Sequence, residues 1–306
     1  MKGVIHLKQY QDALRLIRTN GVYKKGPQKS GAYSLAGVQM RFDLSKGLFP
    51  MLTIRDLSGS WKAAVSELLW ILSGSTDNRV LNEKYGIHFW DSWVDPAHKV
   101  HQEIGFNLER GELGPIYGHQ MRKFGATRNT DGTFQDNGRD QLSIVVEGLR
   151  ENPGYRRHLI TLYNPRDFNA PDGSELVFIS TCHGTLIHFL CYGDRLDMHH
   201  VQRSGDFPIG IPFNIAEYAL LLLMVSKVTG YRPGEMVHTV SDAHIYENQT
   251  ENVDELLTRE PMPLCKVKIP DISDISIETV SQLKVQDFVL EEYTSHPAMK
   301  DIPVEV

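Results

Sequence analysis

The sequence predicts an α/β fold in which a β-sheet, formed largely by the middle of the chain, is combined with long helices. Apolar residues recur at helical spacing near the N-terminus and again at 214–228, while strand-like runs follow one another between 158 and 202. The chain has 306 residues, 41% of them hydrophobic and 23% charged, which is enough for one large core or two modest ones. Because no change in composition divides it, we expect a single domain over 1–306.

The first part of the chain predicts a helix, a strand and a second helix. The opening helix is expected to end at Asn20-Gly21, because glycine commonly terminates helices. A polar stretch at 24–31 separates it from a predicted strand at 33–44, and a mostly buried helix is predicted at 60–73. The apolar residues that define the two helices are Leu7, Tyr10, Leu14 and Ile17, then Trp61, Val65, Leu68, Leu69 and Leu72.

The middle of the chain predicts the sheet, and a long helix follows it. Residues 124–140 are polar and contain the turn-forming Asp131-Gly132, so we expect an exposed insertion there. Gly193-Asp194 is typical of a two-residue hairpin turn. An apolar helix is predicted at 214–228, closed by Gly230. The predicted strands are 158–163, 176–180, 184–192 and 196–202, with two more at 265–269 and 285–290.

Charge and cysteine content limit the partners. The net charge of −6 disfavours general attraction to duplex DNA or to an anionic membrane, although a local basic pocket can still bind a small anion. The longest apolar run, 219–225, is far shorter than the ~20 residues that span a bilayer, and no signal pattern opens the chain. Three cysteines, an odd number without framework spacing, suit free thiols and a reducing compartment. We therefore expect a cytoplasmic protein.

Cys182 is a candidate nucleophile. It lies at the start of a predicted strand among polar neighbours, in Ser180-Thr181-Cys182-His183, where a side chain can face a cleft. A free cysteine is also often an inert buried residue, and both readings stay open on this observation alone. His183 is not an obvious activating partner, because adjacent residues of a strand point to opposite faces.

Arginine residues near two predicted strands suggest an anion site. Arg203 beside Ser204, in the run that ends with Asp206, can clamp a phosphate, and Arg156 and Arg157 can supply further charge. Nearby guanidinium groups would also lower the pKa of a thiol from its ordinary ~8.5. The alternative is that these arginines are surface ion-pair partners.

Glu67 is a candidate for proton transfer, because a carboxyl group buried in an apolar helix has a raised pKa. A position at the solvent edge of the helix is the alternative. No metal site is expected: 13 histidines include His188, His199 and His200 near Cys191, but no pair matches a zinc spacing. The glycine-rich motifs of dinucleotide sites and P-loops are missing as well.

Along nearly the whole chain these segments resemble the thymidylate synthase family. The strongest matches are Gln202-Arg203-Ser204-Gly205-Asp206, Ile209-Gly210-Ile211-Pro212-Phe213-Asn214-Ile215-Ala216-Glu217-Tyr218 and Asp242-Ala243-His244-Ile245-Tyr246. Supporting matches are Gln39-Met40-Arg41-Phe42, Glu67-Leu68-Leu69-Trp70, Trp90-Asp91-Ser92-Trp93, Leu113-Gly114-Pro115-Ile116-Tyr117-Gly118, Arg156-Arg157 and Cys182-His183. The resemblance implies a large mixed sheet flanked by helices and a homodimer formed through the sheet.

The resemblance also implies the reaction and its central residues. Cys182 would add to C6 of dUMP, or of a close deoxypyrimidine monophosphate, so that C5 attacks the methylene group of 5,10-methylenetetrahydrofolate. Asn214 would read the N3 and O4 edge of uracil, and its presence, where related cytidylate hydroxymethylases typically have aspartate, favours dUMP over dCMP. Glu67 and its waters would relay protons to and from O4. Tyr117 would lie close to the nucleophile.

The binding residues follow from the same resemblance. Arg203 and Ser204, with Arg156 and Arg157 from a second subunit, would bind the 5′-phosphate. The 3′-hydroxyl would be held by His244 and Tyr246. Trp90, Trp93, Asp206, Gly210 and Phe213 would shape the folate pocket, with Trp90 and Asp206 also taking part in catalysis. Val306 would close over the bound ligands and exclude water.

The chain departs from the family pattern at four places. Pro27 stands where the family has a phosphate-binding arginine, for which Lys24, Lys25 and Lys29 are candidate replacements. Thr181 replaces the proline that usually precedes the nucleophile, one residue is inserted between Cys182 and Arg203, and the C-terminal tail is one residue longer. If the altered tail and the altered surroundings of Cys182 admit water, water would replace hydride in the last step and give 5-hydroxymethyl-dUMP instead of dTMP. A nucleotide- or RNA-binding protein without turnover is the remaining alternative.

Overall fold

The structure is a computed structural model and describes residues 7–26, 29–94, 111–127, 129, 133–168 and 181–305. Its main feature is a sheet that has six strands in this part of the chain, in the order β1-β2-β6-β5-β4-β3. Neighbouring strands are antiparallel except for β5 and β6, which are parallel. The sheet is therefore mixed, which confirms the predicted fold class. The strands are β1 (Val22–Lys24), β2 (Ala32–Asp43), β3 (Leu159–Ile160), β4 (Leu186–Tyr192), β5 (Arg195–Asp206) and β6 (Arg232–Tyr246).

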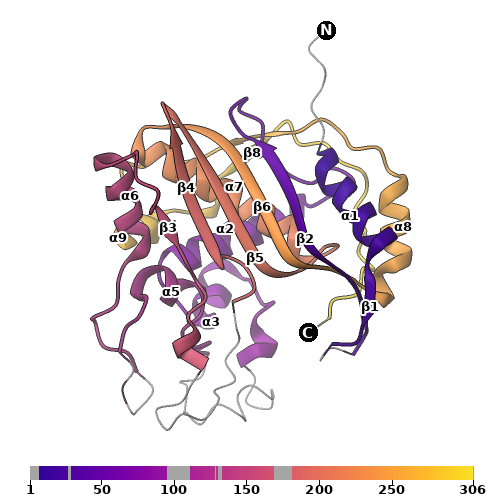
Figure 1. The fold of residues 1–306 in the computed structure, drawn as a ribbon, viewed down its shortest axis with the longest axis horizontal. Helices are drawn as coiled ribbons and strands as arrows, with labels where there is room; N and C mark the ends of the chain where they lie inside the picture. The colour runs from indigo at the N-terminus through magenta and orange to yellow at the C-terminus, as the bar shows by residue number, and fades with distance from the viewer. Residues whose placement is uncertain are drawn as a thin grey trace.

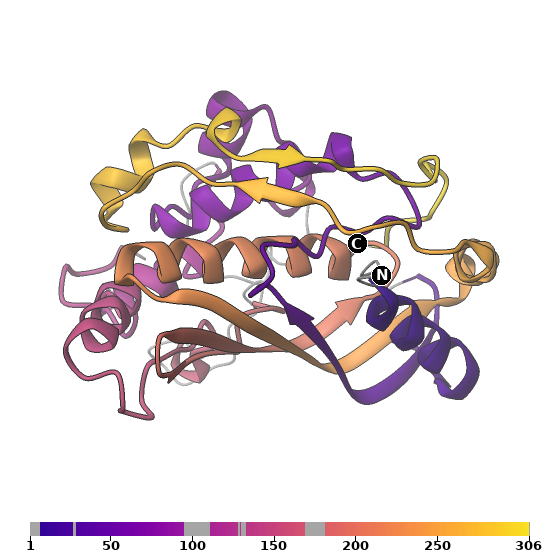
Figure 2. The same cartoon turned by 90° about the horizontal axis from the view of Figure 1, so that it is seen from above.

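Helices and a small second sheet pack on one side of this sheet. Figure 2 shows α7 lying along the sheet, with α2 and the β7–β8 pair in a further layer beyond it. The α-helices are α1 (Lys8–Asn20), α2 (Ser58–Leu72), α3 (Asn78–Val80), α5 (Tyr117–Lys123), α6 (Gln141–Glu151), α7 (Gly210–Thr229), α8 (Thr250–Thr258) and α9 (Ile277–Gln282). The shorter elements are η1 (Leu81–Tyr85), η2 (Asp91–Val94), η3 (Pro165–Phe168), η4 (Glu247–Gln249), η5 (Val285–Asp287), β7 (Lys266–Lys268) and β8 (Val289–Glu291).

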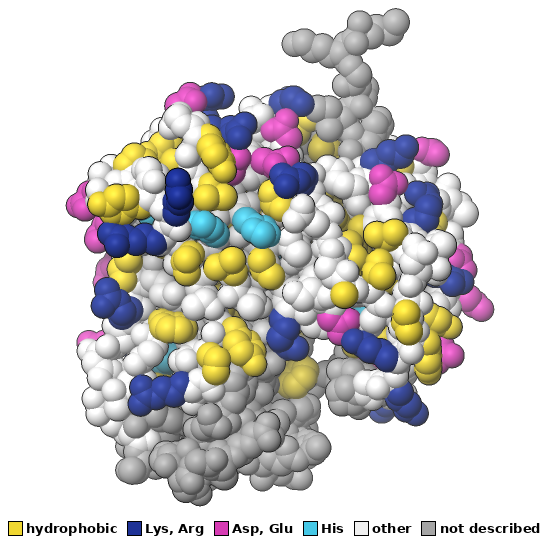
Figure 3. Space-filling view, in the orientation of Figure 1, with side chains coloured by type: hydrophobic (Ala, Val, Ile, Leu, Met, Phe, Trp, Pro, Cys, Tyr) yellow, Lys and Arg dark blue, Asp and Glu magenta, His cyan; other side chains and the backbone are white. Residues whose placement is uncertain are grey.

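The opposite face of the sheet is turned toward the viewer in Figure 1, where no described helix lies in front of the central strands. Residues alternate along β4 between buried positions, such as Ile187 and Phe189, and partly buried ones, such as Leu186 and His188. Alternation is expected when one face of a strand packs on a core and the other does not. Figure 3 shows apolar and histidine side chains gathered on this uncovered face.

Helix α7 is the centre of the core. Its sequence is apolar almost all the way round, and by length and composition it could cross a membrane, but 83% of its most apolar window is buried inside the protein. Pro212 is tolerated because it lies in the first turn, where a missing N–H leaves no helical bond unmade. Gly230 ends the helix at φ 80°, a left-handed conformation that glycine adopts freely.

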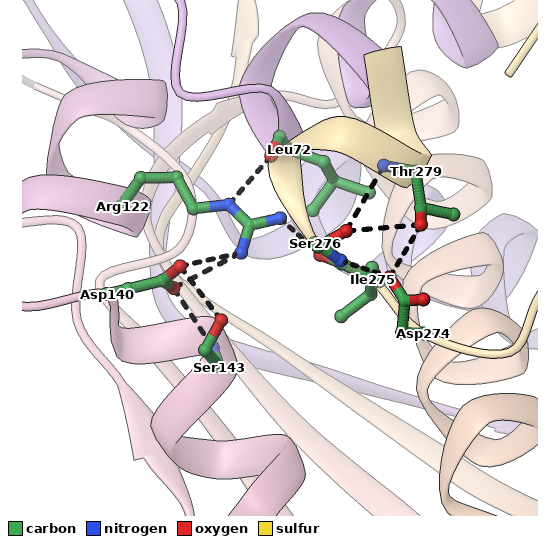
Figure 4. A network of polar contacts seen from close by, with 8 residues as sticks. All are labelled: Leu72, Arg122, Asp140, Ser143, Asp274, Ile275, Ser276 and Thr279. Atoms are coloured by element: carbon green, nitrogen blue, oxygen red, sulfur yellow. Dashed lines mark hydrogen bonds and ion pairs between the residues drawn. The ribbon is translucent and has the colours of Figure 1, made fainter. Parts of the chain in front are cut away.

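A buried arginine holds three helices together on the covered side. The Arg122 side chain donates to the carbonyl oxygens of Leu72 and Ile275 at 2.7 and 2.6 Å, and its ion pair with Asp140 measures 3.1 Å (Figure 4). Asp140 also caps helix α6 by accepting from the backbone N–H of Ser143 at 3.0 Å. Arg122 thereby joins the end of α2 to the start of α6 and to the segment before α9.

Most of the predicted elements are confirmed, with boundaries a few residues away: α1, β2, α2, the β4–β5 hairpin with its turn at Gly193-Asp194, and β7. The strand predicted at 158–163 is wrong beyond Ile160. There the Gln141 side chain bonds both the N–H and the carbonyl of Thr161, at 3.1 and 2.7 Å, which ends the pairing with β4. The strand predicted at 176–180 lies outside the described residues.

Three further differences concern the second half of the chain. Strand β6 was not predicted, because Pro233 and Gly234 follow its first residue and polar residues recur along it. Helix α7 begins at Gly210, ahead of the predicted 214. The strand predicted at 285–290 is instead the short η5 turn followed by β8.

The predicted insertion at 124–140 has exposed residues in its described part, including Gly125 and Gln135, and a bridge between Phe124 and Arg139 joins its ends. The buried apolar residues of the described chain form one cluster, with members from α1, α2, α7 and the sheet. The interpretation of 1–306 as one domain stays a prediction.

Candidate active site

Cys182 lies in a loop just before β4, beside the end of β5. Its carbonyl oxygen accepts from the backbone N–H groups of Arg203 and Ser204 at 2.7 and 3.4 Å. Gly184 follows at φ 68°, and a Cβ there would collide with Leu162 and lie 2.7 Å from Tyr218 Oη. Only glycine fits at position 184, because the backbone is left-handed there and no space remains for a side chain. Gly184 therefore determines the direction of the chain after Cys182.

The thiol of Cys182 contacts the hydroxyl of Tyr117. The Tyr117 Oη atom lies 3.2 Å from Cys182 Sγ and accepts from the Cys182 backbone N–H at 3.1 Å. Because burial raises the pKa of Tyr117 well above its usual value, the tyrosine keeps its proton and can donate it to the sulfur. The Tyr117 bond and the Arg203 charge lower the pKa of Cys182, but burial outweighs them and raises it. In the ligand-free protein the residue is thus a thiol at neutral pH.

His183 contacts two tyrosine side chains, and because residues 182 and 183 lie in a loop, the alternation expected of strand neighbours does not apply to it. Its Nδ1 lies 2.8 Å from Tyr218 Oη, and its ring stacks on that of Tyr117 with 4.2 Å between centroids. Burial lowers the pKa of His183 to about 3, so the imidazole is neutral. It supports Tyr117 by packing and supplies no charge to the thiol.

Glu67 lies on α2 and is buried, with 7% of its surface exposed, so its alternative position at the solvent edge of the helix is wrong. Trp90 Nε1 donates to Glu67 Oε1 at 2.7 Å. The carboxyl of Glu67 also contacts that of Glu217 on α7, and burial raises the pKa of both groups. Glu217 was missed as a site residue, although it stands among apolar neighbours in α7 just as Glu67 does in α2.

A series of side-chain hydrogen bonds orients the amide group of Asn214. His238 Nε2 lies 3.0 Å from Gln202 Oε1, Gln202 Nε2 donates to Asn214 Oδ1 at 2.9 Å, and Asn214 Nδ2 donates to Glu217 Oε2 at 3.1 Å. Burial lowers the pKa of His238 to about 3, so His238 is neutral and its Nε2–H can start the chain as a donor. Gln202 and His238 were missed as well, because nothing in the sequence shows which way a polar residue of a strand points.

A pocket of about 400 Å³ lies beside the Cys182 loop and collects four of the predicted nucleotide-binding residues. Its lining is Lys24, Lys25, Gly26, Ser30, Ala32, Arg203, Ser204, Asp242, His244 and Tyr246. Lys24 Nζ is paired with Asp242 Oδ2 at 2.6 Å, and burial lowers the pKa of His244, which is therefore neutral. Two lysines thus stand with Arg203 in this pocket, near the segment that contains Pro27, itself outside the described residues.

Arg156 and Arg157 lie elsewhere on the protomer. Both are exposed, and they line a separate, open pocket of about 500 Å³ with Gly154 and Tyr155. The Arg157 guanidinium carbon lies 4.5 Å from the centre of the Tyr155 ring. One protomer alone does not bring these arginines to the pocket that contains Arg203.

Asp206 ends β5 between the pocket and the C-terminal segment. It accepts from the Ile209 backbone N–H at 3.2 Å and from Gln249 Nε2 at 3.0 Å, and burial raises its pKa to about 7. Gln249 Nε2 also donates to the Pro303 carbonyl oxygen at 2.9 Å. Gln249, a residue that the sequence did not single out, therefore links the carboxyl group to the tail.

The tail makes a second contact at the pocket, where the Ser30 hydroxyl donates to Glu305 at 2.8 Å and Asn248 Nδ2 donates to the same oxygen at 2.6 Å. Val306 lies outside the described residues.

The other residues predicted to shape a folate pocket lie around Asp206 and Glu67. Gly210 and Phe213 are in the first turn of α7, and Trp93 is in η2 with its ring 6.4 Å from that of Trp90. The Trp90 ring in turn lies 6.1 Å from the Tyr117 ring. Two indole rings and a buried carboxyl fit a flat, aromatic group that carries N–H donors. Among the described residues, no group of three or more His, Cys, Asp or Glu side chains is placed to hold a metal ion.

A thiol that contacts a protonated tyrosine, next to a carboxyl group, an oriented amide and a basic pocket, is an arrangement suited to an enzyme that attacks a small phosphorylated substrate through cysteine. Comparison with known proteins identifies its family. Residues 8–305 match the family model described as thymidylate synthase. The chain is also 37% identical to the human protein named thymidylate synthase over 294 residues, which cover 95% of this chain and 88% of the human one.

The chain belongs to the thymidylate synthase family, and it is therefore a one-carbon transferase that uses methylenetetrahydrofolate as its co-substrate.

Proposed function

We propose that the chain catalyses the reductive methylation of dUMP at C5, giving dTMP, through a covalent bond between Cys182 and C6 of the pyrimidine. The contact between Tyr117 Oη and Cys182 Sγ, at 3.2 Å, carries this proposal. This contact gives the sulfur a proton donor. The backbone carbonyl of Cys182 is bonded to the N–H groups of Arg203 and Ser204 at the end of β5, so the thiol lies next to the pocket that these two residues line.

The residues of the chain divide the chemistry between them. A phosphate in the basic pocket would hold the nucleotide while the amide of Asn214 bonds N3–H and O4 of uracil. The Cys182 thiol first loses its proton to solvent, and the Tyr117 bond and the Arg203 charge stabilise the thiolate. Attack of this thiolate on C6 forms the S–C6 bond, and the electron pair of the C5–C6 double bond moves toward O4, which Glu67 stabilises by hydrogen bonding. When bound, the folate supplies the one-carbon unit and the hydride.

Homodimerisation is part of the proposal. The uncovered face of the sheet carries apolar side chains, and burial of such a face in a second copy is a common solution for a half-covered sheet. Arg156 and Arg157, exposed beside β3, are free to reach the basic pocket of a partner. Their separation from Arg203 within one protomer supports this arrangement.

The experiment is to determine the mass of the product formed from dUMP and 5,10-methylenetetrahydrofolate. The expected product carries a methyl group, because the contacts of Pro303 and Glu305 hold the tail at the site, where it can shield the bound ligands from water. A product heavier by one oxygen atom would instead identify a dUMP hydroxymethylase. Tight dUMP binding without any product would identify a nucleotide-binding protein, and either result would contradict the proposed reaction.

A further inference from the structure

Glu217 is a second carboxyl group beside the nucleophile, and the reaction above gives it no task. It is 2% exposed and lies on α7 three residues after Asn214, whose Nδ2 donates to Glu217 Oε2 at 3.1 Å. The other oxygen, Oε1, is buried and has no hydrogen-bond partner among the described residues. A buried oxygen of this kind requires a hydrogen-bond partner.

Glu67 and Glu217 can satisfy each other only if a proton lies between them. Two ionised carboxylates are acceptors without a hydrogen to donate, and they repel each other strongly when both are buried. The carboxyl groups of these two side chains, on α2 and α7, are close enough to act on each other. One of the two groups must therefore be protonated, while Trp90 Nε1 donates to Glu67 at 2.7 Å.

Within the described part of the chain, the titratable side chains that interact with the pair bring it no positive charge. They are Cys182, Tyr117 on α5 and Tyr218 on α7, and the charge of Arg203 acts on Cys182. The thiol and both phenols are neutral when protonated and negative when not, so none of them can stabilise a second negative charge.

We propose that Glu67 and Glu217 share a single proton at neutral pH and titrate as one pair, in which Glu217 is a positioning residue that keeps a protonated carboxyl group beside the pyrimidine site. The presence of the shared proton is a property of the ligand-free protein. Its use at O4 of the nucleotide rests on the proposed function. Glu217 would also fix the amide of Asn214, since the oxygen that accepts from Nδ2 is held by the same pair.

The first test needs no substrate. Infrared spectra of the ligand-free protein, with glutamate carrying ¹³C in its carboxyl group, distinguish a protonated glutamic acid from Asp206, whose pKa is raised to about 7 by burial. We expect a glutamic acid carbonyl band at pH 7 in the wild-type protein that shifts in D₂O and disappears in Glu217→Gln. The matched control is Ser226→Ala, a buried position on the same helix, which should keep the band. Absence of the band from the wild-type protein would overturn the proposal.

The second test separates the pair from a merely structural role. A glutamine side chain at position 217 can still accept from Asn214. It carries no charge, however, so it no longer opposes the loss of the proton from Glu67. Glu67 would then ionise more easily, so the alkaline limb of the kcat profile should move to lower pH by about one unit or more, with a smaller effect on KM. An unmoved limb would contradict the role at O4. If dUMP is not a substrate at all, the infrared band still decides whether the proton is shared.

Discussion

The Tyr117 hydroxyl is predicted to make Cys182 reactive, and Tyr117→Phe removes that hydroxyl alone. The phenol is the hydrogen-bond partner of Sγ at 3.2 Å and of the Cys182 N–H at 3.1 Å, so the change deletes both contacts and keeps the ring that stacks on His183. Loss of the donor leaves a buried thiolate with less stabilisation, while burial continues to favour the neutral thiol.

The expected magnitude follows from the charge on the sulfur. A hydrogen bond to a charged group contributes about 1.5–3 kcal/mol, and ~1.4 kcal/mol corresponds to a factor of ten in the thiolate fraction. Alkylation of Cys182 by iodoacetamide at pH 7 should therefore become roughly ten to a hundred times slower in Tyr117→Phe. Turnover of dUMP should fall by a similar factor, because the proposed mechanism uses the same thiolate to attack C6.

Peptide-resolved mass spectrometry measures this rate separately from those of Cys191 and Cys265. Tyr218→Phe serves as the matched control, since its hydroxyl contacts His183 Nδ1 at 2.8 Å and not the sulfur, and it should slow alkylation far less. An alkylation rate at Cys182 that is equal in Tyr117→Phe and in the wild-type protein would refute the assignment of the phenol as the donor to the thiolate.

Three further predictions concern stability, each measured by urea unfolding. Arg122→Met should lower the free energy of unfolding by about 3 kcal/mol, because it leaves a carboxylate and two carbonyl oxygens without their buried partner. The exposed ion pair of Arg232 offers the control, and Arg232→Met should change stability by less than about 1 kcal/mol. Burial raises the pKa of Asp206 to about 7, so its contribution to stability is present at low pH and is lost as pH rises from ~4 toward that value. The free energy of unfolding of Asp206→Asn should therefore fall less over this pH range than that of the wild-type protein. An unchanged pH dependence would contradict the raised pKa of Asp206. Gly184→Ala should cost about 1–3 kcal/mol through both strain and collision, whereas Gly193→Ala, also at positive φ but with open space around it, should cost less.

The sequence predicts those parts of the fold whose hydrophobic pattern is strong and local. Helix α1 and strand β2 have clear periods of 3.6 and 2, and Gly193-Asp194 carries its own turn chemistry. Strand β6 escaped because polar residues recur along it and its first residues resemble a turn. The strand after Ile160 ends through the side chain of Gln141, a contact between distant segments that no local pattern contains.

The same limit applies to the site. Glu67 and Cys182 could be named from their surroundings and from the family resemblance, and the pocket around Arg203 contains the expected neighbours. Glu217 has the same local signature as Glu67, but its importance comes from the crossing of α2 and α7, which brings two carboxyl groups into contact. Arg156 illustrates the opposite case, because its predicted role requires a second copy of the chain.

The most direct test of the covalent mechanism is the release of deuterium from [5-²H]dUMP into water in the presence of 5,10-methylenetetrahydrofolate. Addition of a thiolate to C6 is what allows C5 to react and lose its hydrogen, so the label should be released by the wild-type protein and not by Cys182→Ala. Release by Cys182→Ala at the wild-type rate would show that C5 is activated without the thiol and would contradict the central role of Cys182.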